Sequence, residues 1–153
     1  IQANDLVGRK TARDGGQTAK GIARQIAQTE AALAQRSSAH SQAVAKRLKA
    51  AREAFEATVD FIAANASTDP NAAFAGSVPY LMLAGNLMAG WQLARSLSVA
   101  EDLLATGEDK AFLEAKITTA RFYADHLLSK IPGLRDSIVE GADSVTAMAL
   151  EAF

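Results

Sequence analysis

The sequence has no cysteine and only three prolines among its 153 residues. The lack of cysteine excludes a disulfide framework and a thiolate metal site, and it is compatible with the cytoplasmic location that we expect. The scarcity of proline, the abundance of alanine and the absence of sustained alternation of β-branched residues all argue against strands. Together these features predict an all-α chain.

A strong charge of one sign is also missing, because the formal net charge is −1. The first 60 residues hold ten Lys/Arg against six Asp/Glu, and the remainder holds six against eleven. The basic residues are interleaved with acids, so the concentrated basic face of a nucleic-acid binder is not expected. We interpret the two opposite halves as complementary surfaces between domains or subunits. Two histidines without suitably spaced carboxylates predict no metal site.

The most apolar segment begins at Tyr80 and continues to about residue 105. A membrane span needs about 20 mostly apolar residues, whereas Asn86, Gln92 and Arg95 fall inside this segment and an acidic pair, 101–102, closes it. We therefore expect a helix that is buried on most sides, and a membrane location is not expected.

Two glycines lie inside this expected helix, at Gly85 and Gly90. Each costs about 1 kcal/mol relative to alanine in a helix interior. Their presence predicts the close approach of another backbone or of a bulky side chain at both positions. Trp91 is the side chain that we expect to fill such a gap.

The periodic apolar positions predict five helices separated by clusters of turn-forming residues. The expected helices cover residues 17–35, 37–64, 80–105, 112–131 and 134–148. Ser37–Ser38 is expected to cap the second helix, a loop is expected from Asn65 to Pro79, and Pro132–Gly133 is expected to end the fourth helix. The fifth is short, with Leu150 and Phe153 left to dock or fray. The predicted architecture is an up-and-down bundle of four main helices plus a short C-terminal helix.

The first 16 residues are expected to stand apart from this bundle. Ile1 to about Lys10 has the character of the end of a helix, and the following residues up to Gly16 include the glycine pair of a connection. The start at isoleucine, without a methionine or a leader, favours a fragment of a longer protein. We therefore predict a boundary between residues 1–16 and a bundle domain of residues 17–153.

A resemblance to a known family covers nearly the whole chain and is strongest in three separated segments: Ile1–Gly16, Pro79–Trp91 and Lys116–Phe153. They resemble the C-terminal helical domain of the longer bacterial acyl-CoA dehydrogenases, the acetyl-CoA dehydrogenase C-terminal-like domain, together with the last turns of the dehydrogenase domain. The resemblance implies a parent flavoenzyme that uses FAD to oxidise an acyl-CoA to its 2-enoyl form and passes electrons to an electron-transfer flavoprotein. It also implies a homo-oligomer.

The same resemblance places the catalytic glutamate upstream of Ile1, so the fragment alone is expected to have no catalytic residue and to bind no cofactor. Arg9 and Lys10 are the candidate site residues, because a guanidinium and an ammonium group suit the phosphates of CoA. Their alternative role is that of cations at a helix C-terminus. Gln2 is a weaker candidate for a position near the flavin.

The other polar residues have plain interpretations. Asp125–His126 is not expected to act as an acid–base pair, since adjacent helical residues point about 100° apart, and His40 has no expected partner. Arg121 is expected either to pack or to reach an acid on a neighbouring helix or on the dehydrogenase domain. The remaining carboxylates are expected on solvated helix faces.

Two competing functions remain open from the sequence. The first is a non-catalytic helical interaction module unrelated to flavoenzymes. The second is a membrane-surface role, for which the basic face of an amphipathic helix is needed. The residues available for that face are Lys46, Arg47, Lys49 and Arg52.

Overall fold

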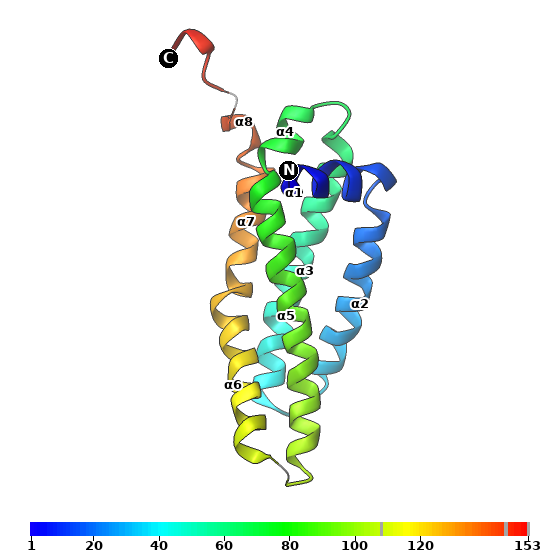
Figure 1. The fold of residues 1–153 in the computed structure, drawn as a ribbon, viewed down its shortest axis with the longest axis vertical. Coiled ribbons are helices and arrows are strands. Elements are labelled where there is room, and N and C mark those ends of the chain that lie inside the picture. The colour runs from blue at the N-terminus through cyan, green and yellow to red at the C-terminus, as the bar shows by residue number, and fades with distance from the viewer. Residues whose placement is uncertain (108, 146, 153) are drawn as a thin grey trace.

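The structure, a computed structural model, describes residues 1–107, 109–145 and 147–152, and of Leu150 it describes the backbone alone. Three long helices and a line of two shorter ones form an up-and-down bundle (Figure 1). These are α2 (Gln17–Ala34), α3 (Ala39–Asn65), α5 (Ser77–Leu104), and α6 (Lys110–His126) followed by α7 (Ile131–Val139). The described residues contain no strand, so the predicted all-α bundle is confirmed.

The turn between α2 and α3 follows the predicted capping. The Ser38 side chain accepts hydrogen bonds from the backbone amides of His40 and Ser41 at the start of α3. A serine in this position satisfies amides that have no partner within the helix. The cap fixes the reversal of chain direction between the first two bundle helices.

The N-terminal segment lies across one end of the bundle (Figure 1). It consists of α1 (Gln2–Asp5), a π-helix (Leu6–Thr11) and a short 3₁₀ helix (Ala12–Asp14). Val7 and Thr11 are buried, so the segment packs on the bundle. At Gly16, where φ is +79°, an added Cβ would lie 2.5 Å from Cγ1 of Val59, and the chain enters α2 there. The boundary after Gly16 as a division between domains stays a prediction.

The prediction of a loop between residues 65 and 79 is wrong for most of these residues. A short helix, α4 (Pro70–Ala75), fills its centre, and α5 begins at Ser77 rather than at Tyr80. The Asp69 side chain accepts a hydrogen bond from the Ala72 amide at 3.1 Å, and Pro70 occupies the first turn, where its missing N–H costs nothing. Turn-forming residues here act as a helix start.

The predicted stop at Pro132 is also wrong. Helix α6 ends at His126, a short 3₁₀ helix (Leu128–Lys130) follows, and Pro132 lies in the first turn of α7. Proline is well accommodated at a helix start, so it marks the beginning of α7 rather than the end of α6. The interruption turns the fully buried Leu128 into the bundle.

Leu128 explains one of the two glycines in α5. An added Cβ at Gly90 would lie 2.5 Å from Cδ2 of Leu128, so the predicted close approach is confirmed there. The prediction for Gly85 is wrong, because no atom lies within 4 Å of an added Cβ. Trp91 does not fill the gap, since its indole N–H donates to Oγ1 of Thr29 on α2 at 2.8 Å.

The C-terminal part is less continuous than expected. After α7 the chain forms a single turn, α8 (Ala142–Val145), and a 3₁₀ turn (Leu150–Ala152). Val145 and Met148 are exposed instead of packed, and so is Phe112, which was expected on the apolar side of the fourth helix. The expected docking or fraying of Phe153 and of the Leu150 side chain lies outside the described residues.

A single hydrophobic core unites the helices. Its largest fully buried side chains are Tyr80, Ile26, Leu33, Leu48, Ile62, Leu83, Leu87, Leu97, Leu128, Ile131, Ile138 and Val7. They come from α2, α3, α5 and α7, from the 3₁₀ helix before α7 and from the N-terminal segment. Helix α6 adds Leu113, Ile117, Ala120 and Ala124 to the same core. This core holds the two ends of the bundle, where the candidate sites lie, in fixed positions relative to each other.

Candidate functional site

The residues singled out for CoA binding lie on the surface of the N-terminal segment. Arg9 and Lys10 are exposed neighbours in the π-helix, and Gln2 is exposed at the first turn of α1. Arg9 donates to the Asp5 carboxylate through Nε at 2.5 Å and through Nη2 at 2.8 Å. The hydrogen bond from Arg9 lowers the pKa of Asp5. Asp5 therefore fixes the direction of the guanidinium, and the structure brings Arg9 and Lys10 together at one end of the bundle.

An apolar cavity of about 380 Å³ lies between this segment and the helices α2, α3 and α5. Lys10 lines it from the N-terminal segment, and most of the other lining residues are apolar. They include Leu6, Ile22, Phe55, Tyr80 and Met88. The cavity adjoins the predicted site, although the sequence analysis did not anticipate it, because its walls come from four separate segments.

A buried hydrogen bond ties the N-terminal segment to the bundle beside this cavity. The Oγ1 atom of Thr11 and the hydroxyl of Tyr80 lie 2.9 Å apart. Burial raises the pKa of Tyr80, which keeps its hydroxyl protonated and able to take part in this bond as a neutral group. The Phe55 ring stacks on Tyr80 with centroids 6.2 Å apart. These contacts make the N-terminal segment a structural part of the bundle end.

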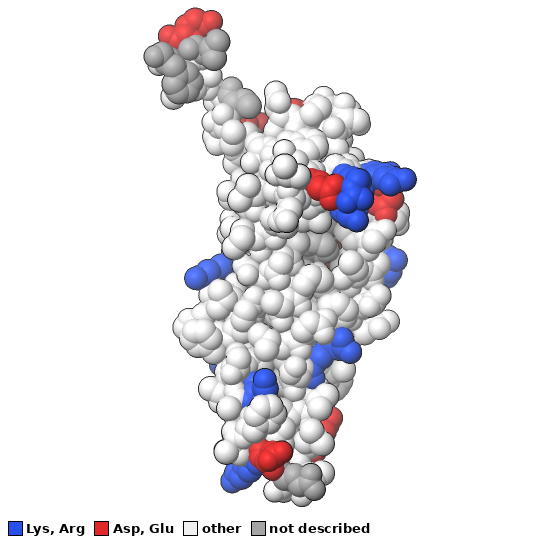
Figure 2. All heavy atoms as spheres, in the orientation of Figure 1, with Lys and Arg blue, Asp and Glu red and all other residues white. Residues whose placement is uncertain are grey.

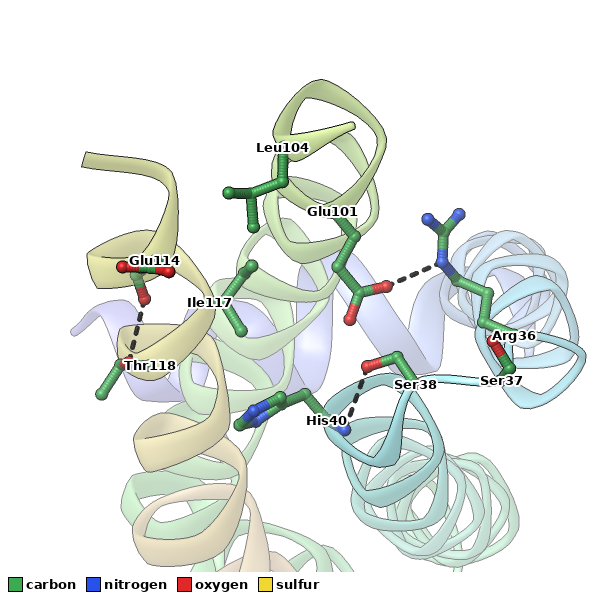
Figure 3. Close-up of a pocket in the computed structure, with 9 residues that line it drawn as sticks. All are labelled: Arg36, Ser37, Ser38, His40, Glu101, Leu104, Glu114, Ile117 and Thr118. Carbon is green, nitrogen blue, oxygen red and sulfur yellow. Dashed lines mark hydrogen bonds and ion pairs between the residues drawn. The ribbon is translucent and has the colours of Figure 1, made fainter. Parts of the chain in front are cut away.

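A larger cavity, of about 690 Å³, lies at the opposite end of the bundle (Figure 3). It is bounded by the α2–α3 connection with Arg36 and Ser38, by the end of α5 with Glu101, and by α6 with Glu114 and Thr118. In Figure 3 the Glu101 carboxylate extends from α5 towards Arg36 and Ser38. The position brings acidic and basic groups from three parts of the chain together.

Glu101 is the centre of a polar network in this cavity. Its Oε2 accepts from Nε of Arg36 at 2.8 Å and from Oγ of Ser41 at 2.7 Å, and Arg36 also pairs with Asp102. The Glu101 side chain is 12% exposed, and its Oε1 is buried without a hydrogen-bond partner among the described residues.

The pKa of Glu101 results from opposing effects. Burial raises it, whereas the nearby hydroxyls of Ser38 and Ser41 and the guanidinium of Arg36 lower it more, so the net shift is downward. Glu101 is therefore held as a carboxylate that fastens the α2–α3 connection to α5. Glu101 was expected at the end of an apolar helix and, like the other carboxylates, on a solvated face. The solvated face is wrong for Glu101, because its side chain is only 12% exposed. The available signal was Ser41, a polar residue one turn before Val44 on the core side of its helix.

The basic residues considered for a membrane surface are largely engaged in ion pairs. The Arg52 side chain is 13% exposed and binds Glu30 at 2.9 Å and Glu56 at 2.6 Å. Arg47 lies 3.7 Å from Asp125 and Lys49 lies 4.0 Å from Glu53. Acids on the same and on neighbouring helices therefore face Arg47, Lys49 and Arg52, which offsets three of the four cations that the membrane-surface function requires.

Asp125 is held by arginines rather than by its neighbour. Arg121, on the same helix, donates to it at 2.5 Å, so the acidic partner of Arg121 in this structure lies on its own helix and not on a neighbouring one. The His126 ring lies against Phe122 instead, with centroids 4.5 Å apart. The expectation that Asp125–His126 is not an acid–base pair fits this geometry.

The part of the chain that the structure describes lacks two further classes of feature. It contains no group of three or more His, Cys, Asp or Glu side chains placed to hold a metal ion. None of its helices combines the length and the apolar character that crossing a membrane demands.

Comparison with known proteins identifies the family. The family described as acetyl-CoA dehydrogenase C-terminal like matches residues 22–149. The chain is 49% identical over 150 residues to the 3-methylmercaptopropionyl-CoA dehydrogenase of Ruegeria pomeroyi, which covers 98% of this chain and 25% of that protein. It is 38% identical over 72 residues to the broad-specificity linear acyl-CoA dehydrogenase FadE5 of Mycobacterium tuberculosis, covering 45% of this chain and 12% of that protein.

These matches confirm the resemblance found in the sequence and favour it over an unrelated helical module. The chain spans about a quarter of the length of the first relative, and the 72 residues that match the second cover about an eighth of that protein. The chain belongs to the acetyl-CoA dehydrogenase C-terminal-like family.

Proposed function

We propose that this member of the family is the helical accessory domain of an FAD-dependent acyl-CoA dehydrogenase whose chemistry takes place in the remainder of a longer parent chain. The observation that carries the proposal is the match along 98% of this chain to a named dehydrogenase of which it covers only a quarter. In the parent, an acyl-CoA would be oxidised to its 2-enoyl form and the electrons would pass to an electron-transfer flavoprotein.

The described side chains support an accessory rather than a catalytic role. Removal of the α-proton of a thioester needs a carboxylate that is free to accept it at the working pH. The two least exposed pairs, Glu101 with Arg36 and Glu30 with Arg52, are instead committed to arginines. Their carboxylates hold helices together. We place the base in another part of the parent chain, as the family resemblance implies.

The candidate flavin residue lies at the surface. Gln2, the weak candidate for a position near FAD, is exposed and lines neither of the cavities at the bundle ends. A flavin needs a cradle that positions its ring and excludes water. We therefore assign FAD to the remainder of the parent, with Gln2 at its border.

Arg9 and Lys10 are proposed to bind the phosphates of CoA in the parent. Both are exposed, adjacent and cationic, and Asp5 orients the Arg9 guanidinium through two hydrogen bonds. A pre-oriented guanidinium beside an ammonium group suits a phosphate, because charge-assisted hydrogen bonds are the stronger ones.

The CoA role is tested in the parent by Arg9→Ala combined with Lys10→Ala. Loss of charged hydrogen bonds worth about 1.5–3 kcal/mol raises KM for acyl-CoA by about 10-fold or more while kcat changes little. Arg24→Ala is the matched control, since it removes an exposed cation on α2 away from this segment. An unchanged KM in the double variant removes the CoA role and leaves the accessory role standing.

The accessory role is tested by deleting residues 17–153 from the parent. Val7 and Thr11 are buried against the bundle, so the deletion uncovers apolar surface on the segment that stays behind. We expect a poorly soluble or misassembled enzyme. A truncated parent with normal assembly and normal turnover contradicts the proposal.

A further inference from the structure

A groove of about 430 Å³ lies between the second half of α5 and the first half of α6. Its lining includes three large apolar side chains that are exposed to solvent: Val99 at 57%, Leu103 at 46% and Phe112 at 58%. Apolar side chains scattered singly over a surface are ordinary, whereas several gathered in one hollow mark a binding site. This α5–α6 groove lies towards the opposite end of the bundle from the N-terminal segment (Figure 1), so it is separate from the residues proposed to bind CoA.

The polar lining residues lie at one end of the α5–α6 groove. On α5, Gln92 and Arg95 precede the apolar Val99 along the helix. On α6, Lys116 follows Phe112 by about one turn. Since α5 and α6 run in opposite directions (Figure 1), Lys116 lies on the side of the groove towards Arg95. The groove therefore has a cationic end and an apolar end.

The two cations of the groove are held in place without being neutralised. Arg95 donates through Nη1 to Oε1 of Gln92 at 2.9 Å, and its guanidinium lies 5.7 Å from the centre of the Trp91 ring. Nζ of Lys116 lies 5.1 Å from the centre of the Phe112 ring. Neither cation forms an ion pair with an acid in the part of the chain that the structure describes. An aromatic face attracts a cation but leaves most of its N–H donors unused, so these donors are available to an anion.

No acid competes for these cations among the described residues that line the groove. Figure 2 views the molecule from the side on which α5 faces the reader, and over the middle and lower part of that face basic groups stand singly in mostly uncharged surface. Cations in such surroundings raise the local concentration of anions. The charge of the groove therefore suits an anionic ligand.

We propose that the α5–α6 groove binds the anion of a free, straight-chain fatty acid. The carboxylate accepts hydrogen bonds from Arg95 and Lys116, and charge-assisted hydrogen bonds of this kind are the stronger ones. The alkyl chain lies along Val99, Leu103 and Phe112, where it covers apolar surface that is otherwise exposed to water. The site does not depend on the proposed CoA role, because it uses none of the same residues.

A helix from a second copy, or from the remainder of the parent chain, suits the groove less well. Interfaces between proteins have an apolar centre surrounded by a polar rim, whereas here the polar and the apolar residues occupy opposite ends. The volume of the groove lies within the range of about 300–1,000 Å³ that is typical of small-molecule sites, which are mostly apolar with a few polar groups that fix orientation. A charged end next to an apolar end matches the two parts of a fatty-acid anion.

The first test is a series of ligands added to the unaltered chain, with binding measured by isothermal titration calorimetry. The probes are butyrate, hexanoate and octanoate, each below the concentration at which it forms micelles. We expect the association constant to rise about 2- to 4-fold for each added methylene group, because each one buries more apolar surface. 1-Octanol has the chain without the charge, and we expect it to bind about 5-fold more weakly than octanoate. An affinity independent of chain length, or equal binding of octanol and octanoate, overturns the proposal.

The second test changes the two ends of the groove separately at exposed positions. Arg95→Gln combined with Lys116→Gln should weaken the binding of octanoate by about 10-fold. Leu103→Gln should weaken it by about 3-fold, because part of the apolar wall is lost. The matched controls outside the groove are Lys130→Gln, at an exposed cation, and Met82→Gln, at an apolar side chain of α5 that is 54% exposed. Circular dichroism verifies that each variant keeps its helical content. Losses as large in the controls as in the groove variants contradict the proposal.

A third measurement distinguishes a free fatty acid from a lipid surface that carries the same kind of anion. Vesicles of phosphatidylcholine mixed with phosphatidylglycerol are sedimented together with the chain. We expect no sedimentation that depends on Arg95 and Lys116. Vesicle binding that the Arg95→Gln, Lys116→Gln variant abolishes, without binding of octanoate, overturns the proposal in favour of an anionic membrane surface. Either outcome leaves the accessory role untouched, because that role is tested by deletion from the parent.

Discussion

Gly90→Ala is the substitution that most directly tests the packing of the bundle. An added Cβ would lie 2.5, 2.8 and 2.9 Å from Cδ2, Cγ and Cδ1 of Leu128, which is fully buried. Since the contact includes Cγ, the whole Leu128 side chain must move and not only its end. Alanine gains about 1 kcal/mol of helix propensity, and overpacking a closed core costs about 1–3 kcal/mol. The expected net change is a loss of about 0–2 kcal/mol in the free energy of unfolding.

Gly21→Ala is the matched control on α2. An added Cβ there meets only the flexible end of Arg24, at 3.7 Å. We expect it to stabilise the chain by about 0.5–1 kcal/mol. The free energies of unfolding of the two alanine variants should therefore differ by about 0.5–3 kcal/mol, which shifts Tm by up to several degrees for a chain of this size. Thermal and urea unfolding followed by circular dichroism, at one protein concentration, measure the difference.

A double-mutant cycle isolates the contact itself. Leu128→Ala alone is expected to lower the free energy of unfolding by about 2–5 kcal/mol, because it leaves a cavity in the core. In that background Gly90→Ala should become stabilising, since the obstructing side chain is gone. If Gly90→Ala stabilises the unaltered chain as much as Gly21→Ala does, the close packing of Leu128 on α5 is refuted.

Three further predictions concern polar contacts. Tyr80→Phe should lower the free energy of unfolding by about 1 kcal/mol in urea titration, because Thr11 loses its buried partner; an unchanged value contradicts a role for this bond. Glu101→Gln should lower the free energy of unfolding by about 2 kcal/mol at neutral pH, because the charged hydrogen bonds of the carboxylate with Arg36 and Ser41 are lost. Folding lowers the pKa of Glu101 from 4.5, so the stability that its carboxylate contributes is complete above pH 4.5 and is lost as the pH falls through the lowered pKa. If the unaltered chain and Glu101→Gln still differ in stability below that pKa, the carboxylate is not the cause of the difference. Arg52→Ala should lower the free energy of unfolding, measured by thermal unfolding, by about 3 kcal/mol, because it leaves the Glu30 carboxylate without its cation. If the double variant Arg52→Met, Glu30→Gln loses as much stability, the effect comes from packing and not from the unpaired charge.

The long helices could be predicted because their apolar periodicity and their caps are local signals. Ser38 caps α3 as expected, and α2 ends within one residue of its predicted end. The failures arose where one residue type serves two purposes. Pro132 can follow a helix or open one, and only the docking of Leu128 in the core decides that it opens α7.

The candidate sites were predictable in part. Arg9 and Lys10 could be singled out because they lie in a segment with a recognisable family pattern, and their exposure is compatible with the proposed contact. The network around Glu101 joins residues about 60 positions apart. No local pattern contains such a contact, since it depends on how α5 packs against the α2–α3 connection. Gly85 shows the same limit, because open space beside a helix leaves no trace in the sequence.

The most direct test of the account is the mass and visible absorption spectrum of the natural polypeptide that contains this chain. We predict a polypeptide about four times as long as the chain, in proportion to the Ruegeria relative, with a flavin spectrum that is bleached by acyl-CoA. A colourless polypeptide close to 153 residues in length would contradict the assignment of this bundle to an acyl-CoA dehydrogenase.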